Sequence, residues 1–204
     1  MKTNNKSYNF IITGVGGQGN VLSSRLIGQI FIRKGYFVTI GETYGSSQRG
    51  GSVMSHIRIS PKKQLSPLIP IGKADLMMAL EPVEGIRVLI PYGNPNIISL
   101  VNTRPFYPVD VNAGEATYPD VEEVKKTIED LSKEVYYIDA TEKAIQMGST
   151  ILGNMIMIGL LVELQLLPLK LEDMHKAILL NFGKDKMDIN IAALEEGRKA
   201  AHKF

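Results

Sequence analysis

Short apolar runs alternate with stretches of helical periodicity along the first two thirds of the chain, which is the pattern of an alternating α/β protein. Apolar and β-branched runs predict strands at Tyr8–Thr13, Tyr36–Gly41, Ala74–Leu80, Ile97–Val101 and Val135–Asp139. Val53–Ile59 alternates apolar with polar residues, which predicts a strand with one more solvated face. Apolar residues spaced by three and four predict helices at Asn20–Lys34, from Glu81-Pro82 onwards and at Val121–Lys133. The proline-rich segment Asn102–Asp120 predicts an extended connection instead.

From about residue 140 the pattern is helical. Thr150–Leu166 is apolar nearly all round, which predicts a core helix or one pressed against a second subunit. Leu171–Asn181 and Lys186–Lys199 are amphipathic. No repeat or convincing boundary divides the chain, so residues 1–204 are expected to form a single domain. Its expected fold is a doubly wound, mostly parallel, Rossmann-like sheet with extra C-terminal helices.

The first two predicted strands each run into a glycine-rich turn. Strand, glycine turn, helix and strand together predict the opening βαβ unit of the sheet. The two turns are then expected at the carboxyl ends of neighbouring parallel strands, where such sheets place their ligands and partner contacts.

The first turn fits the dinucleotide-binding pattern G-x-G-x-x-G with Gly14, Gly16 and Gly19. Glu42, at the end of the second strand, stands where an acid would bind a ribose. This pattern favours NAD, but glycines are also required wherever a strand turns sharply into a packed helix. The second turn is long and polar for a ribose site, and nothing downstream supplies a hydride-transfer site.

The second turn places the guanidinium of Arg49 beside two glycines and several hydroxyls. Such a loop can hold a phosphate or carboxylate, dock into another subunit, or be a solvated surface loop. The residues expected to contact a cofactor are Gly14, Gly16, Gly17, Gln18, Gly19, Glu42, Tyr44, Gln48, Arg49, Gly50, Gly51 and Ser52.

The composition of the chain excludes several kinds of binding and catalytic site. Lys and Arg number 23 against 21 Asp and Glu, which gives no electrostatic support for nucleic-acid or membrane-surface binding. The absence of cysteine excludes disulfides, cysteine-ligated clusters and thiol catalysis on this chain. His56, His175 and His202 are scattered, so neither a metal site nor a catalytic residue is predicted. The short N-terminal apolar stretch predicts a buried strand and a cytoplasmic protein.

The two turns together resemble the paired signatures of a known family. Gly14–Gly19 and Glu42–Arg58 are similar to those of the gamma-type subunit of 2-oxoacid:ferredoxin oxidoreductases. The nearest branch is the small (beta) subunit of indolepyruvate ferredoxin oxidoreductase, although Tyr44 stands where that branch commonly has histidine. The resemblance extends through Ala74–Pro82, Val101–Pro105, Leu152–Met155 and Leu167–Leu169.

This resemblance implies oxidative decarboxylation of a 2-oxoacid to an acyl-CoA, with electrons passed to ferredoxin. The 2-oxoacid is expected to be indolepyruvate or another aryl or branched one. Thiamine diphosphate, Mg²⁺ and [4Fe-4S] clusters are implied on a large partner subunit, so the isolated chain holds no cofactor and is expected to be inactive. Its turns would border the partner's active-site entrance or contact the phosphates of coenzyme A.

Two other functions remain open from the residues alone. One is a stand-alone NAD(P)-dependent oxidoreductase that uses Gly14, Gly16, Gly19 and Glu42. The other is an independent ligand-binding module on the same fold. The sequence also leaves open the subunit stoichiometry and any self-association of the isolated chain.

Overall fold

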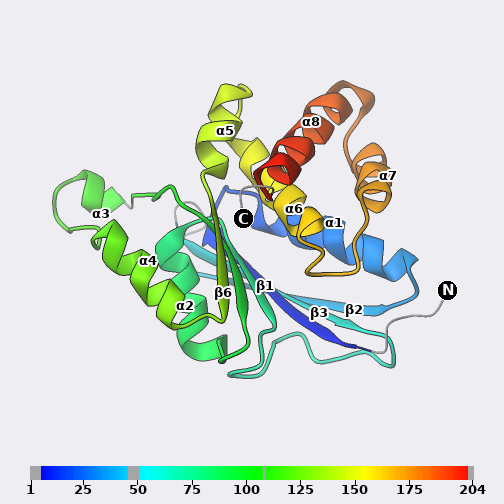
Figure 1. The fold of residues 1–204 in the computed structure, drawn as a ribbon, viewed down its shortest axis with the longest axis horizontal. Coiled ribbons are helices and arrows are strands. Elements are labelled where there is room, and N and C mark those ends of the chain that lie inside the picture. The colour runs from blue at the N-terminus through cyan, green and yellow to red at the C-terminus, as the bar shows by residue number, and fades with distance from the viewer. Residues whose placement is uncertain (1–5, 46–50, 108, 202–204) are drawn as a thin grey trace.

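A six-stranded sheet in the order β2-β3-β1-β4-β5-β6 forms the centre of the structure (Figure 1). The computed structural model describes residues 6–45, 51–107 and 109–201. The strands are β1 (Tyr8–Val15), β2 (Phe37–Tyr44), β3 (Ser52–Ser60), β4 (Leu76–Ala79), β5 (Ile98–Asn102) and β6 (Glu134–Ile138). β1, β4, β5 and β6 pair in parallel, while β3 is antiparallel to both β1 and β2. The mostly parallel α/β sheet predicted from the sequence is therefore confirmed.

The order of the first strands differs from the prediction. β3 lies between β1 and β2, so the expectation that these two strands are parallel neighbours is wrong. Thr13 pairs with Met54 on β3, which pairs in turn with Thr43 on β2. The connection from β2 to β3 is short, and a short connection joins adjacent antiparallel strands. Because β2 still runs in the same direction as β1, both glycine turns lie at one edge of the sheet, here called the carboxyl edge.

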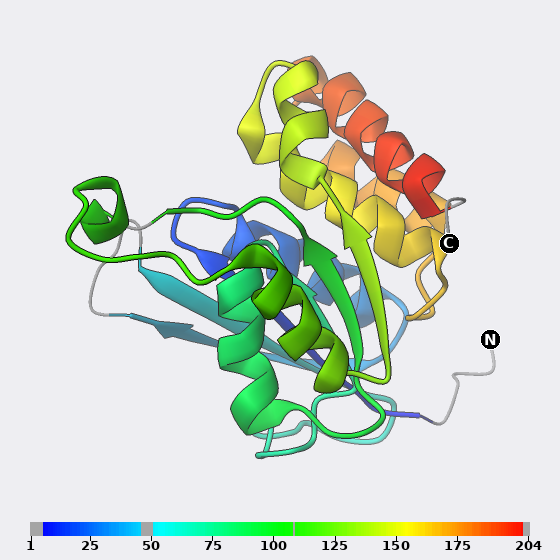
Figure 2. The same ribbon diagram turned by 60° about the vertical axis from the view of Figure 1, so that its left-hand side comes forward.

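Helices cover both faces of the sheet (Figures 1 and 2). One face carries α2 (Pro82–Tyr92) and α4 (Val121–Asp130); the other carries α1 (Asn20–Arg33), α6 (Gly153–Glu163) and α7 (Leu171–Asn181), with α8 (Lys184–Ala201) packed on α6. α5 (Ala140–Gln146) and a 3₁₀ turn (Thr150–Leu152) lead from β6 into α6. Alternate residues of β1 serve the two cores: Phe10 and Ile12 pack toward α1 and α6, and Ile11 toward α2 and α4.

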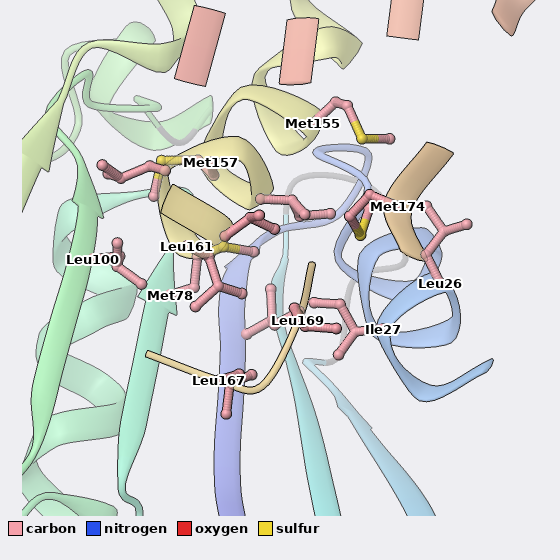
Figure 3. Packing of buried hydrophobic residues seen from close by; sticks show 14 of the residues in the cluster. Leu26, Ile27, Met78, Leu100, Met155, Met157, Leu161, Leu167, Leu169 and Met174 are labelled. Atoms are coloured by element: carbon pink, nitrogen blue, oxygen red, sulfur yellow. The ribbon is translucent and has the colours of Figure 1, made fainter. Parts of the chain in front are cut away.

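The apolar helix predicted at Thr150–Leu166 is part of the core. It begins with the 3₁₀ turn and ends at Glu163, and every residue from Asn154 to Val162 is buried. Met157 and Leu161 lie over Met78 and Leu100 of the sheet (Figure 3). Of the two alternatives left open by the sequence, the structure therefore gives this helix the core role.

The connection between β5 and α4 is not wholly extended as predicted. It contains a short helix, α3 (Val109–Asn112), which stands apart from the other helices (Figures 1 and 2). The other predicted helices are present, with ends that shift by a few residues; α8, for example, runs from Lys184 to Ala201.

Candidate functional site

The first glycine turn closes around the side chain of Gln18 at the carboxyl edge. Gln18 Oε1 accepts a hydrogen bond from the amide of Val15 (2.8 Å), and Nε2 donates one to the carbonyl of Leu80 after β4 (3.2 Å). The side chain thereby ties the turn to the neighbouring strand. The chain leaves β1 and β4 toward opposite faces here, and such switch points are where α/β sheets bind ligands.

Two glycines of this turn adopt the left-handed backbone conformation, Gly17 with φ +105° and Gly19 with φ +92°. Gly19 directly precedes α1, which has no side-chain N-cap and no acid in its first turn. Within the described residues, the backbone amides at the start of α1 therefore have no side-chain cap, an arrangement that suits an anion. A Cβ at Gly19 would lie 2.2 Å from Nδ2 of Asn154, so the starts of α1 and α6 are in contact.

The second glycine turn meets the first. The amide of Gly16 donates a hydrogen bond to the carbonyl of Gly51 (2.9 Å), and the amide of Gly45 donates one to the carbonyl of Ser52 (2.7 Å). Tyr44, at the end of β2, has 60 % of its surface exposed. The structure thus brings Gly14–Gly19 together with Gly51 and Ser52. The predicted residues Gln48, Arg49 and Gly50 lie outside the described part of the chain.

Glu42 is bound within the protein. Its Oε1 accepts a hydrogen bond from the Ser24 hydroxyl of α1 (3.0 Å), and its Oε2 accepts one from the Ser55 hydroxyl of β3 (2.6 Å). β3 also separates the strand of Glu42 from the first turn. The carboxylate that the dinucleotide pattern assigns to a ribose is therefore occupied by two serines.

A small polar pocket lies beside the first turn, where β4, β5 and β6 end. The side chain of Asn102 connects the walls of this pocket by four hydrogen bonds. Its Nδ2 donates to the Leu80 carbonyl (2.9 Å) and to Thr141 Oγ1 (2.9 Å). Its Oδ1 accepts from the amides of Ala140 (2.9 Å) and Thr141 (3.3 Å). The pocket has a volume of about 30 Å³, enough for a water molecule or one small group. Its walls are Gln18, Leu80, Asn102, Ala140, Thr141, Thr150, Gly153, Asn154 and Met157.

Asn154 is another polar side chain in the wall of this pocket. Only 4 % of its surface is exposed, and it forms no side-chain hydrogen bond to any described residue. Buried amides are normally paired, so this one has capacity for a bound group. The sequence prediction included neither Asn154 nor Asn102 nor Thr141. One signal was available: Asn102 is a polar residue directly after a buried apolar strand.

Two carboxylates lie at the start of α2, at the same edge: Glu81 is its N-cap residue and Glu84 is in its first turn. Glu81 Oε2 accepts a hydrogen bond from the amide of Glu84 (2.9 Å). Glu84 in turn accepts one from the Ser52 hydroxyl (2.5 Å) and pairs with Arg87 (3.1 Å). Burial raises the pKa of Glu81, and the hydrogen bonds that it accepts offset part of this rise. The start of a helix favours such negative charge.

His56 is buried in the centre of β3, away from the carboxyl edge. Its Nδ1 accepts a hydrogen bond from the amide of Ile69 (3.4 Å), so the neutral imidazole carries its proton on Nε2. The ring meets Tyr92 edge to face, with 5.0 Å between centroids. His56 is completely buried and is a packed residue of the sheet.

We expect the stability of the protein to fall with acidification because of His56. Burial lowers the pKa of His56 in the folded state, so the unfolded chain takes up a proton first as the pH drops. Below a pH of about 6.5, this group should reduce the free energy of unfolding by about 1.4 kcal/mol per pH unit until the folded state also protonates. Urea unfolding of the wild type and of His56→Asn between pH 5 and 7.5 measures the effect. The variant should lose this part of the slope; equal slopes would contradict the assignment.

No helix in the described ranges is both long and apolar enough to cross a bilayer. Within the same residues, no group of three or more histidines and acids is placed to hold a metal ion.

Comparison with known proteins identifies relatives along nearly the whole chain. The family model for pyruvate ferredoxin/flavodoxin oxidoreductase matches residues 9–200. The chain is 38 % identical over 197 residues to indolepyruvate oxidoreductase subunit IorB of Pyrococcus horikoshii, covering 96 % of each protein. It is 36 % identical over 193 residues to the subunit of the same name from Archaeoglobus fulgidus, covering 95 % of this chain and 94 % of that protein.

Solved structures share the fold. The gamma subunit of a keto/oxoacid ferredoxin oxidoreductase from Geobacter sulfurreducens matches with a TM-score of 0.68 at 19 % identity, over 97 % of this chain and 99 % of that one. The 2-oxoglutarate:ferredoxin oxidoreductase of Magnetococcus marinus matches with a TM-score of 0.72 at 21 % identity. That match covers 98 % of this chain and 32 % of the longer one.

Proposed function

The chain belongs to the pyruvate ferredoxin/flavodoxin oxidoreductase family, and we propose on this basis that it works as the small subunit of a 2-oxoacid:ferredoxin oxidoreductase. The similarity to the indolepyruvate oxidoreductase subunits, at 38 % identity over 96 % of the chain, carries the proposal. A stand-alone nicotinamide enzyme is not favoured, because the relatives of this chain are oxidoreductase subunits. In addition, both carboxylate oxygens of Glu42 already accept hydrogen bonds from serine hydroxyls.

The complex oxidises a 2-oxoacid in the presence of coenzyme A, releasing CO₂, forming an acyl-CoA and passing two electrons to ferredoxin. We assign thiamine diphosphate, Mg²⁺ and the [4Fe-4S] clusters to a large partner subunit, since this chain has no cysteine to ligate a cluster. By its similarity to IorB, we propose indolepyruvate or another aryl or branched 2-oxoacid as the substrate. The cytoplasmic location remains a prediction.

The carboxyl edge is the surface that this chain contributes. Two features there suit the phosphates or carbonyls of coenzyme A. The first is the start of α1, which no described side chain caps, and the second is the amide of Asn154, which lines one pocket with the Thr141 hydroxyl. We propose that the two glycine turns contact coenzyme A or border the entrance to the partner's active site. In both arrangements the chain binds and orients, while the partner carries out the redox chemistry.

Co-expression with a large subunit that bears thiamine diphosphate and cluster motifs tests this function. The purified complex should reduce ferredoxin or a viologen with one or more of a panel of 2-oxoacids, and only when coenzyme A is present. The small subunit alone should show no turnover. Turnover by the isolated chain with a soluble nicotinamide as its sole added cofactor would overturn the proposal.

Arg49→Ala separates the two roles of the carboxyl edge. If Arg49 binds a phosphate, loss of its charge-assisted hydrogen bonds should raise the KM for coenzyme A by about tenfold or more while the complex stays intact. If Arg49 contacts the partner, the complex should dissociate more readily at an unchanged KM. Steady-state kinetics and the mass of the complex distinguish these results. Lys63→Ala, in the exposed loop after β3, is the matched control and should change neither the KM for coenzyme A nor the mass of the complex. If Arg49→Ala also leaves both quantities unchanged, Arg49 has neither role.

A further inference from the structure

The connection between β5 and α4 forms an arm that projects from the carboxyl edge (Figures 1 and 2). The arm comprises residues 103–107 and 109–120. It exposes two adjacent aromatic side chains: Phe106 is 44 % and Tyr107 is 48 % exposed. Aromatic residues of this kind are enriched at protein–protein interfaces, where they supply large contact areas at a low cost in conformational entropy.

One buried carboxylate fastens both limbs of the arm. Glu81 Oε1 accepts hydrogen bonds from the amide of Phe106 on the outgoing limb (3.4 Å) and from the hydroxyl of Tyr118 on the returning limb. The rings of Tyr107 and Tyr118 meet edge to face, with 5.2 Å between their centroids. Only 2 % of Glu81 is exposed, and burying a carboxylate is unfavourable unless it is well paired. The base of the arm is therefore fixed, and it holds the two exposed aromatic residues in place.

Hydrogen bonds connect the base of the arm to the glycine turns. Glu81 binds the amide of Glu84, the Glu84 carboxylate binds the Ser52 hydroxyl, and Gly51 next to Ser52 accepts a hydrogen bond from Gly16. The arm and both turns are thus parts of one continuous edge. A partner that covers the turns would also meet the arm.

The described charges of the arm are mostly engaged within the chain. Arg104 pairs with Glu142 (3.1 Å), and the Asp120 carboxylate caps α4 by accepting from the amides of Glu122 and Glu123. The feature that the arm offers a partner is consequently its aromatic pair, which fits an apolar pocket.

We propose that the arm is a docking element for the large, thiamine-diphosphate-bearing subunit, with Phe106 and Tyr107 entering an apolar pocket on that subunit. Glu81 is a positioning residue, which holds the arm in the docking conformation through Phe106 and Tyr118. The inference rests on the proposed function in one respect, namely that the chain assembles with such a subunit. The large subunit is favoured over a second copy of this chain because the arm shares its edge with the two glycine turns, which we propose to contact coenzyme A or to border the entrance to that subunit's active site.

Hydroxyl-radical footprinting of the co-purified complex and of the isolated chain tests the docking role. Phe106 and Tyr107 should be oxidised at least fivefold more slowly in the complex. Phe37, which is 46 % exposed and lies at the opposite end of the sheet, is the matched control and should be oxidised at the same rate in both. If Phe106 and Tyr107 are oxidised as slowly in the isolated chain at the same concentration as in the complex, a second copy of the chain covers the arm. That result would overturn the proposal.

The outcomes also separate this inference from the proposed function. A complex that forms with an unprotected arm overturns the docking role alone. Absence of any complex overturns the proposed function, and the docking role with it.

Variants complete the test. Phe106→Ala together with Tyr107→Ala should raise the dissociation constant of the complex at least tenfold, since both rings are lost while the amide of Phe106 can still bind Glu81. Phe37→Ala should leave it unchanged. Tyr118→Phe, which removes one hydrogen bond to Glu81 and keeps the ring, should raise the dissociation constant several-fold and increase the oxidation of Tyr107 in the isolated chain. An unchanged constant in either arm variant would overturn the corresponding role.

Discussion

Gly197→Ala is expected to destabilise the protein by roughly 3 kcal/mol or more, a large share of the stability of an ordinary domain. A Cβ at Gly197 on α8 would lie 1.8 Å from the carbonyl oxygen of Ile156 on α6 and 2.7 Å from its carbon. These are backbone atoms of a fully buried helix, so no side chain can rotate away from the new methyl group. The two helices would have to separate. Urea unfolding, followed by circular dichroism, measures the shift.

The contact is reciprocal, which strengthens the expectation. Gly159 on α6 faces α8, and a Cβ there would lie 2.0 Å from the Leu194 carbonyl oxygen. Alanine normally favours a helix over glycine by about 1 kcal/mol, so an observed loss of stability must come from this packing. Gly183→Ala is the control: its Cβ would have no atom within 4 Å, and the change should stay within about 1 kcal/mol. A similarly small effect at Gly197 would show that the helices can move apart freely.

The sequence predicted the elements well because each one has a local pattern. The apolar run of β1 and the glycine turn before α1 depend only on nearby residues, and both are where they were expected. The pairing of β3 between β1 and β2 was missed because pairing depends on which strands meet in three dimensions. A hairpin signal was present in the glycine-rich stretch before Ser52, but the resemblance of both turns to ligand-binding turns concealed it.

The candidate site was predicted less completely than the fold. Its glycines belong to a motif and could be recognised, whereas Asn102, Thr141 and Asn154 are single polar residues without a shared spacing. They become neighbours only because β5, α5 and α6 all end or begin at the carboxyl edge. Glu42 shows the converse case. Its position in the sequence suits a ribose, but the structure places two serines within hydrogen-bonding distance of its carboxylate.

Asn102→Leu should have the second large effect, on both stability and the pocket. Leucine has a similar volume but can neither accept the hydrogen bonds from the Ala140 and Thr141 amides nor donate to the Leu80 carbonyl. The two amides at the start of α5 would be left buried without partners, at a cost of about 1–3 kcal/mol for each group that water cannot reach. We expect a loss of roughly 3 kcal/mol in urea unfolding. The start of α5 should also move, so the complex should need more coenzyme A for half-maximal activity.

Asn102→Asp distinguishes the two halves of this network. Aspartate keeps an acceptor for the Ala140 and Thr141 amides, but it loses both donors and sets a carboxylate oxygen against the Leu80 carbonyl. If the amides at the start of α5 dominate, the aspartate variant should be clearly more stable than the leucine variant. Equal losses would instead assign the stability to the donors that join β4, β5 and α5. A leucine variant within about 1 kcal/mol of the wild type would mean that water replaces the side chain, and the edge would then be more open than the structure indicates.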